Sequence, residues 1–363
     1  MPSSAPVSAT GSTGPRTSGS ADGPGLAPAD GTVRVTGTLA TSVNVPWGMA
    51  RLPGGDILVS SRDTHRIQRI HPDGRPPTVV GTVPGVVSQA SQGGESGLLG
   101  LASSPGYATD HRVYAYYSTA SDNRIAYLGY NEGAPAGKQL GTPHVVLAGI
   151  PRGLHHNGGR IAFGPDGMLY AGTGEAGNPA LAQDRASLGG KILRMTPDGA
   201  PAPGNPFPGS VVYTYGHRNV QGLAWDPQGR LWASEFGDKK ADELNLIQPG
   251  RNYGWPAAQG KNGGGKYTDP VVEWGTEEDS PSGIAYADGS IWMAALKGRR
   301  LWRIPLDGAR AAGAPQDFLV GTYGRLRSVL AVGDGHLLLT TSNTDGRATP
   351  RAGDDRILEL TVS

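Results

Sequence analysis

Short apolar stretches centred on an alanine recur along the chain. Each is followed by a turn rich in proline, aspartate and glycine and then by a second apolar stretch, as in residues 222–234. Successive alanines are 46 to 62 residues apart, a period typical of β-propeller blades. The alanines that mark the repeat are Ala50, Ala102, Ala162, Ala224, Ala285 and Ala331. Six repeats predict six blades, and the small residues suit inner strands that crowd around a central channel.

Most repeats also contain a later stretch in which apolar and polar residues alternate, at residues 66–70, 191–195, 243–247, 300–304 and 356–360. Alternation predicts a strand with Ile and Leu pointing inward and basic residues, Lys191 among them, pointing outward. An early strand from Val33 is expected to join the last blade and close the ring, which protects the sheet edge. The sequence therefore predicts an all-β fold, a six-bladed β-propeller with four-stranded antiparallel blades.

The composition favours many short strands joined by turns, because the chain has 58 glycines and 30 prolines. The 32 Lys and Arg residues nearly balance the 31 Asp and Glu residues. No basic stripe stands out, so nucleic acid is not an expected partner. The absence of cysteine excludes disulfides, zinc–thiolate sites and thiol nucleophiles. No apolar run approaches the ~20 residues that span a bilayer.

Residues 1–31 differ from the rest of the chain, because they are almost all Ser, Ala, Pro, Gly and Thr. Such a segment buries too little apolar surface to offset its chain entropy. We expect residues 1–31 to be a disordered leader and residues 32–363 to form the propeller and catalytic domain. The leader lacks the basic start and apolar core of a signal peptide. A leader of this composition often follows an export signal, so the expected location is extracytoplasmic, either secreted or at the cell surface.

Two polar motifs occupy equivalent places just before the inner strands of the third and fourth blades. The first contains His155 and His156, and the second contains Arg218 and Asn219. Residues at the start of an inner strand face the channel mouth, where propellers bind ligands. A histidine there could act as a general base, because its pKa lies near neutral pH. The alternatives are histidines that only bond turn backbones and an arginine that only pairs with a neighbouring blade.

Two further sets of residues have the chemistry of ion binding. The glycine-containing acidic loop at Gly237 and Asp238 offers oxygens to Ca²⁺, which prefers about six to eight of them. Lys297, Arg325 and Arg327 form a basic set near the end of the chain, and the two arginines alternate along one strand face. Arginine matches carboxylates or phosphates with two hydrogen bonds. The alternatives are a solvated acidic loop and an edge strand guarded by charge.

In their shared order these motifs resemble the soluble PQQ-dependent (pyrroloquinoline quinone) glucose dehydrogenases and the related aldose sugar dehydrogenases. The resemblance covers the chain from about residue 40 to the end. It rests on residues 97–102, 156–161, 216–223, 242–247 and 252–256, followed by residues 295–297 and 325–327. It implies oxidation of an aldose at C1 to a lactone, hydride transfer to PQQ, a catalytic Ca²⁺ and an external electron acceptor.

The resemblance also implies roles for individual residues. His156 matches the base that takes the proton from the C1 hydroxyl of the sugar. Glu95 and His155 stand at sugar-contacting positions, where the glucose enzymes carry an amide and a carboxylate, and this difference points to the aldose-type branch. Arg218 and Asn219 match contacts to PQQ. The cations that match its carboxylate partners are Lys297, Arg325 and Arg327, and the backbone carbonyls that match calcium ligands are those of Gly237 and Asp238.

The implied roles agree with the chemistry. PQQ carries three carboxylates, so its pocket needs several cations, and a Lewis-acidic Ca²⁺ and Arg218 could both stabilise charge on the quinone oxygen. Two other functions compete with this one. A calcium-dependent lactonase or esterase propeller would place side-chain carboxylates where this chain has Arg and His. A non-catalytic secreted binding propeller has no need of His156 together with four cations.

Overall fold

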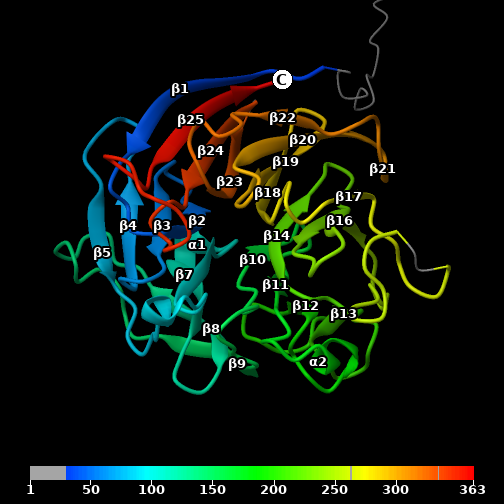
Figure 1. Cartoon of the computed structure of the whole chain (residues 1–363). Coiled ribbons are helices and arrows are strands. Elements are labelled where there is room, and N and C mark those ends of the chain that lie inside the picture. Colours follow the sequence, from blue (N-terminus) through cyan, green and yellow to red (C-terminus); the bar gives the residue numbers. More distant parts are fainter. Residues whose placement is uncertain (1–29, 262–263, 334) are drawn as a thin grey trace, which may run out of the picture.

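The computed structural model describes residues 30–261, 264–333 and 335–363, and it consists of six antiparallel sheets arranged as blades around one axis (Figure 1). In five blades the first strand along the chain is innermost and later strands lie successively further out; in the last, β1 supplies the outer strand. The inner strands of neighbouring blades contact one another around the whole ring. This arrangement confirms the predicted six-bladed propeller. Most of the predicted leader, residues 1–29, lies outside the described residues. The expected extracytoplasmic location was inferred from this segment and stays a prediction.

The strand boundaries match the repeats. The first blade contains β2 (Pro46–Arg51), β3 (Ile57–Ser61), β4 (Arg66–Ile70) and β5 (Thr78–Thr82). The second contains β6 (Leu98–Ser103), β7 (Arg112–Ser118), β8 (Asn123–Gly129) and β9 (His144–Ile150). The third contains β10 (Ile161–Phe163), β11 (Leu169–Gly172), β12 (Lys191–Met195) and β13 (Val212–Tyr215). Each of the six marker alanines lies on an inner strand of the ring.

The remaining blades follow the same plan, with one variation. The fourth contains β14 (Val220–Trp225), β15 (Leu231–Glu235), β16 (Asp242–Ile247) and β17 (Val272–Trp274). The fifth contains β18 (Pro281–Ala287), β19 (Ser290–Ala295), β20 (Arg300–Asp307) and two short outer strands, β21 (Arg310–Ala311) and β22 (Gln316–Phe318). The sixth contains β23 (Leu326–Gly333), β24 (His336–Thr341), β25 (Ile357–Val362) and β1 (Val33–Ala40).

Helical turns are few and short: η1 (Ala90–Gln92), α1 (Tyr107–Asp110) and α2 (Ala180–Gln183). In the described part of the chain, no helix has the length and apolar character needed to cross a membrane.

The two ends of the described chain close the ring in a single sheet. Strand β1 pairs antiparallel with β25, with Val33 opposite Val362, and the blue and red strands lie side by side in Figure 1. The Thr32 amide extends the pairing by donating to the Ser363 carbonyl at 3.0 Å. The predicted closure is therefore confirmed, and the sixth blade depends on both ends of the chain.

The apolar core consists of six clusters, each between two neighbouring blades. Between the first and second blades, for example, Leu58 and Ile67 pack in one cluster with Val113 and Leu128. A middle strand therefore has apolar neighbours on both faces, so alternation along it is weaker than predicted. Lys191 on β12 shows the consequence, because it is buried and does not point outward as predicted.

Lys191 is accommodated by oxygens rather than by water. Its Nζ donates to the carbonyls of Leu181, Ala182 and Gly189 at 2.6 to 3.1 Å. Burial lowers the pKa of Lys191 to about 8, because removal from water disfavours the charged amine. This side chain therefore anchors the turn around α2 to the third blade.

Glycines allow the inner strands to approach one another closely. A Cβ atom on Gly222 of β14 would lie 2.5 Å from the Ser282 carbonyl oxygen of β18, in the next blade. Three more glycines are crowded in the same way. A Cβ atom on any of them would lie similarly close to backbone atoms of the next inner strand or of the segment that leads into it; they are Gly48, Gly100 and Gly283. Contacts between blades therefore explain why the repeat has small residues at these positions.

We expect Gly222→Ala to lower the free energy of unfolding by about 2 kcal/mol or more, because overpacking against backbone forces the strands apart. Urea denaturation measures the change. Gly54→Ala is the matched control, since no atom of a neighbouring residue lies within 4 Å of a Cβ there. Equal stability of the two variants would contradict the contact between β14 and β18.

Candidate active site

The site lies at one mouth of the ring, in a cavity of about 390 Å³. In an antiparallel blade the start of the first strand and the end of the second lie at the same edge. The starts of the first strands and the ends of the second strands therefore meet at this mouth, and all six blades contribute to it. The charged residues that line the cavity are Arg62, Glu95, Lys297, Arg325, Arg327 and Arg347.

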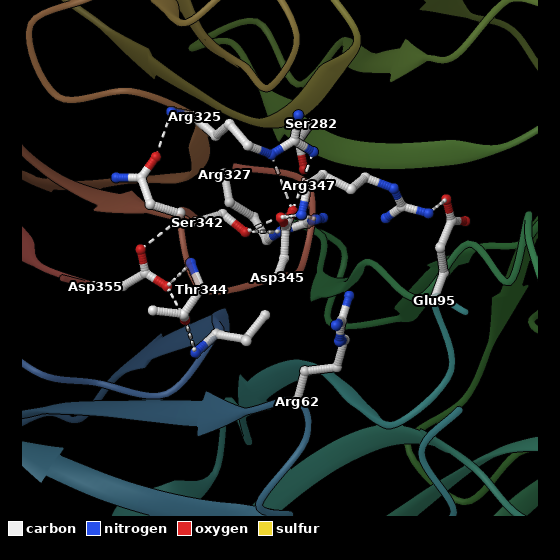
Figure 2. A network of polar contacts seen from close by, with 12 residues as sticks. Arg62, Glu95, Ser282, Arg325, Arg327, Ser342, Thr344, Asp345, Arg347 and Asp355 are labelled. Carbon is white, nitrogen blue, oxygen red and sulfur yellow. Dashed lines mark hydrogen bonds and ion pairs between the residues drawn. The ribbon is translucent and has the colours of Figure 1, made fainter. Parts of the chain in front are cut away.

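A buried carboxylate, Asp345, organises two of these cations (Figure 2). Arg325 Nε donates to Asp345 Oδ2 at 3.0 Å, and Arg327 Nη2 lies 3.7 Å from the same oxygen. Arg327 also donates from Nη1 to Gln221 Oε1 at 3.1 Å. Gln221 itself is held by Ser282, whose hydroxyl donates to the same oxygen at 3.0 Å. Arg325 and Arg327, predicted to face the same way, thus meet at one carboxylate.

Burial and the neighbouring charges both shift the pKa values of these groups. Burial lowers the pKa of Arg327 to about 9, and Arg62 and Arg325 act in the same direction while Asp345 opposes them. Burial also lowers the pKa of Arg325. For Asp345 burial favours a higher pKa, but Arg325 and Arg327 together hold it below its ordinary value. Asp345 therefore stays ionised at neutral pH and both arginines stay charged, so the cavity wall is positively charged.

Two more cations complete the positive wall. Arg62 is buried and donates to both carboxylate oxygens of Asp63, at 2.7 and 3.0 Å. Lys297 is about half exposed and pairs with the exposed Glu277. A cavity lined by several fixed cations favours an anion with more than one carboxylate or phosphate.

Beside the cavity, His156 forms a close pair with a buried glutamate. His156 Nδ1 lies 2.7 Å from Glu175 Oε1, and only 2% of the Glu175 side chain is exposed. An ionised carboxylate can only accept, so Nδ1 carries the hydrogen and Nε2 is left free to take up a proton. The backbone of His156 has a φ of 57°, an unfavourable conformation for a residue with a side chain. This geometry fits a general base held in one orientation.

Glu95 connects His156 to the far side of the mouth. Its Oε2 accepts the His156 backbone amide at 2.9 Å, and its Oε1 lies 3.8 Å from His155 Nδ1. Arg347 reaches from the loop between β24 and β25 and pairs with the same Oε1 at 3.3 Å. Figure 2 shows this side chain extending from the Asp345 network towards Glu95. The two predicted sugar contacts, Glu95 and His155, thus lie together next to the candidate base.

Neither Arg218 nor Asn219 lines this cavity. The Asn219 Oδ1 accepts the amide of Gly158, which lines the cavity, at 2.9 Å. Its buried Nδ2 finds no hydrogen-bond partner among the described residues. A buried donor without an acceptor is costly, and a polar ligand that reached this atom would satisfy it. Together with the cationic wall, it shows that the residues present fit PQQ.

One of the two predicted calcium ligands, the Gly237 carbonyl, faces Arg218 in this structure. Arg218 Nη1 donates to the Gly237 carbonyl, and its Nη2 lies 3.3 Å from Asp238 Oδ1. The guanidinium also lies 5.3 Å from the Trp255 ring centre. Within the described residues no group of three or more His, Asp or Glu side chains is placed to hold a metal ion. The positive charge of Arg218 at the Gly237 carbonyl would repel a calcium ion there, so calcium binding favours movement of Arg218 away from this oxygen.

Several residues of the site were not identified from the sequence. They are Trp47, Arg62, Glu175, Gln221, Asp345 and Arg347. A signal for some of them was present, because Arg62, Glu175 and Asp345 follow the second strands of their blades by one to four residues. Lys297 has the same position after β19, so alignment of the second-strand ends would have placed all four at the mouth.

Comparison with known proteins gives consistent matches. A family model described as Glucose / Sorbosone dehydrogenase matches residues 43–350. The PQQ-bound structure of an aldose sugar dehydrogenase from Streptomyces coelicolor is 64% identical, with a TM-score of 0.91 over 93% of this chain and 100% of that chain. Aldose sugar dehydrogenase YliI of Escherichia coli is 28% identical over 86% of this chain and 92% of its own length.

A further relative is quinoprotein glucose dehydrogenase B of Acinetobacter calcoaceticus, which is 33% identical over 61% of this chain. The match spans about half of that protein, 52% of its length. The resemblance inferred from the sequence motifs is thereby confirmed at the level of the family.

We expect Asp345→Asn to lower the free energy of unfolding by about 3 kcal/mol, because it leaves two buried guanidinium groups without their carboxylate. Urea denaturation measures the loss. Asp317→Asn removes a surface partner of Arg300, with 41% of the aspartate side chain exposed, and should cost less than about 1 kcal/mol. Equally small effects of both substitutions would show that Asp345 does not stabilise the cationic wall.

Proposed function

Because the chain belongs to the glucose and sorbosone dehydrogenase family, we propose that it oxidises aldose sugars at C1 to lactones, with PQQ accepting the hydride and an external acceptor taking the electrons. The observation that carries this proposal is the cationic cavity beside the pair formed by His156 and Glu175. The cavity provides charges for an anionic cofactor, and the pair provides a base for a hydroxyl proton. Sugar oxidation with a quinone cofactor needs both.

The cofactor would be held by the cations of the cavity wall. Lys297, Arg325 and Arg327 line the cavity and would bind the carboxylates of PQQ through charge-assisted hydrogen bonds. Asn219 would offer its free Nδ2 donor. When bound, PQQ supplies the two-electron acceptor for the hydrogen at C1 of the sugar. The protein's own part is to orient the sugar and to move the hydroxyl proton.

His156 would take that proton at Nε2. Its Nδ1 hydrogen is engaged by Glu175, which fixes the ring orientation and stabilises the imidazolium that forms. The proton leaves the C1 hydroxyl oxygen as the C1–H bond breaks with its electron pair, so the carbon is oxidised and the lactone forms. Glu175 thus acts as a positioning residue through His156.

Glu95 and His155 would contact the sugar hydroxyls near C1. Glu95 is held by Arg347 and by the His156 amide, so its carboxylate is fixed in place. The His155 side chain is about half exposed and could adapt to different sugars. The site is thereby proposed to accept aldoses as a class.

Calcium is proposed as a second cofactor, held by the carbonyls of Gly237 and Asp238. The loop also offers the carboxylates of Asp238 and Asp242 next to a hollow of about 330 Å³. Such oxygen donors suit Ca²⁺, which would supply Lewis acidity at the quinone oxygen. Arg218 donates to the Gly237 carbonyl, and repulsion between its charge and the ion would favour release of this hydrogen bond. The released guanidinium would then be available to stabilise negative charge in the site.

We expect His156→Ala to reduce turnover at least about 100-fold, since general-base catalysis contributes that much or more. The PQQ dissociation constant, measured by absorbance titration, should change by less than about threefold, because the base contacts the sugar. His336→Ala, at an exposed position on β24, is the control and should retain full turnover. Wild-type turnover of His156→Ala would remove this residue from the mechanism.

A second substitution tests the cationic wall. Lys297→Ala should raise the PQQ dissociation constant by about 10- to 100-fold, because a charge-assisted hydrogen bond contributes about 1.5–3 kcal/mol. Lys297 pairs only with an exposed glutamate in the described structure, so the variant should fold normally. Lys138→Ala, an exposed lysine on the second blade, is the control. Unchanged PQQ affinity in Lys297→Ala would mean that the cofactor does not contact this wall.

A further inference from the structure

Arg160 lies deeper in the ring than the cations that line the cavity. It stands just before β10 of the third blade, and its side chain reaches residues of three other blades. Nε donates to the Gln221 carbonyl at 2.8 Å, and Nη2 donates to Ser328 Oγ at 2.9 Å. The guanidinium lies 4.4 Å from the Trp47 ring centre. Arg160 thus bridges the centre of the ring beneath the site.

The charge of Arg160 has no carboxylate beside it. Its hydrogen-bond acceptors are a carbonyl and a hydroxyl, and it forms no ion pair within the described chain. The residue is partly exposed, but burial of its guanidinium lowers the pKa of Arg160 to about 9, with no acidic group opposing the shift. At neutral pH the guanidinium is therefore charged and uncompensated.

The cations that line the cavity differ from Arg160 in this respect. Each of them has a carboxylate within 4 Å. The pairs are Arg62 with Asp63, Lys297 with Glu277, Arg325 and Arg327 with Asp345, and Arg347 with Glu95. These five cations share four carboxylates, so the wall has one excess positive charge. Arg160 adds a second, and it alone of these cations has no carboxylate beside it.

The position of Arg160 connects this charge to the cavity. Trp47 and Gln221 both line the cavity, and both contact Arg160 from behind. Gln221 also accepts a hydrogen bond from Arg327, which lies 5.8 Å from the Trp47 ring centre. An anion in the cavity would be separated from Arg160 by one layer of side chains. In such an enclosed site the attraction between charges is screened far less than in water.

We infer that Arg160 is a positioning residue for the cofactor, whose uncompensated charge strengthens the binding of an anionic quinone without touching it. The inference rests on the proposed function. A buried charge without a partner is costly, and a bound tricarboxylate would offset that cost. The alternative is a purely structural role, in which Arg160 links the blades through its hydrogen bonds and its charge does not affect cofactor binding.

The test compares the dissociation constant of PQQ, measured by absorbance titration, in the wild type and four variants. Arg160→Gln and Arg160→Met remove the charge. Either variant can be used for the comparison if it retains the wild-type circular dichroism spectrum. Both should weaken PQQ binding by about tenfold or more. Arg160→Lys restores the charge and should bind within about threefold of wild type. Ser328→Ala removes one hydrogen-bond acceptor while keeping the charge, and should also bind within about threefold.

Thermal melts add an independent readout. Removal of the charge should reduce the rise in Tm that PQQ produces, because a ligand stabilises the folded state according to its affinity. Wild-type PQQ affinity in a folded, neutral Arg160 variant would overturn the inference while leaving the proposed function intact. The inference would also be overturned if Arg160→Lys and Ser328→Ala lost as much PQQ affinity as Arg160→Gln. That result would support the purely structural role of Arg160. Failure of the wild-type protein to bind PQQ would instead overturn the proposed function itself.

Discussion

The close approach of the six inner strands around one axis is the constraint on which the rest of the structure depends. Glycines such as Gly222 leave no room for a Cβ atom between neighbouring blades. Because the strands converge so closely, the starts of the first strands and the ends of the second strands meet at one mouth. Residues as far apart in sequence as Arg347 and Glu95 are thereby brought into contact there. The ring closes through the pairing of β1 with β25, so the site depends on both chain ends.

The electrostatics of the site follow from this geometry. Convergence places several cations around one cavity, and their mutual repulsion must be offset. Asp345 offsets part of it by accepting from Arg325 and lying near Arg327, while Arg160 has no such partner. A positively charged enclosure of this kind is stabilised by an anionic ligand, and this is how the fold connects to a quinone cofactor with three carboxylates. His156 stands beside that enclosure in a strained conformation held by Glu175.

The fold could be predicted well from the sequence because the repeat sets both the number and the order of the strands. All six marker alanines lie on inner strands, and the early strand at Val33 closes the ring as expected. Lys191 was assigned to the wrong side because a middle strand packed between blades loses its polar face. Glu175 and Asp345 were missed although each follows the second strand of its blade, because their loops carry no motif and the pairing with His156 or with the arginines is defined by distance in space. The orientation of Arg218 towards Gly237 is also set by packing, and the spacing of residues in the sequence does not indicate it.

The most direct measurement is reconstitution of the purified, cofactor-free protein with PQQ and Ca²⁺, an artificial electron-accepting dye and a panel of aldoses. We predict dye reduction that requires the protein, PQQ, Ca²⁺ and an aldose together, and the rates across the panel would rank the substrates. Omission of Ca²⁺ alone isolates the contribution of the metal. Absence of dye reduction with every aldose, together with an unchanged PQQ absorbance spectrum in the presence of the protein, would contradict the account. Hydrolysis of lactones with Ca²⁺ alone would then identify the protein as a calcium-dependent hydrolase.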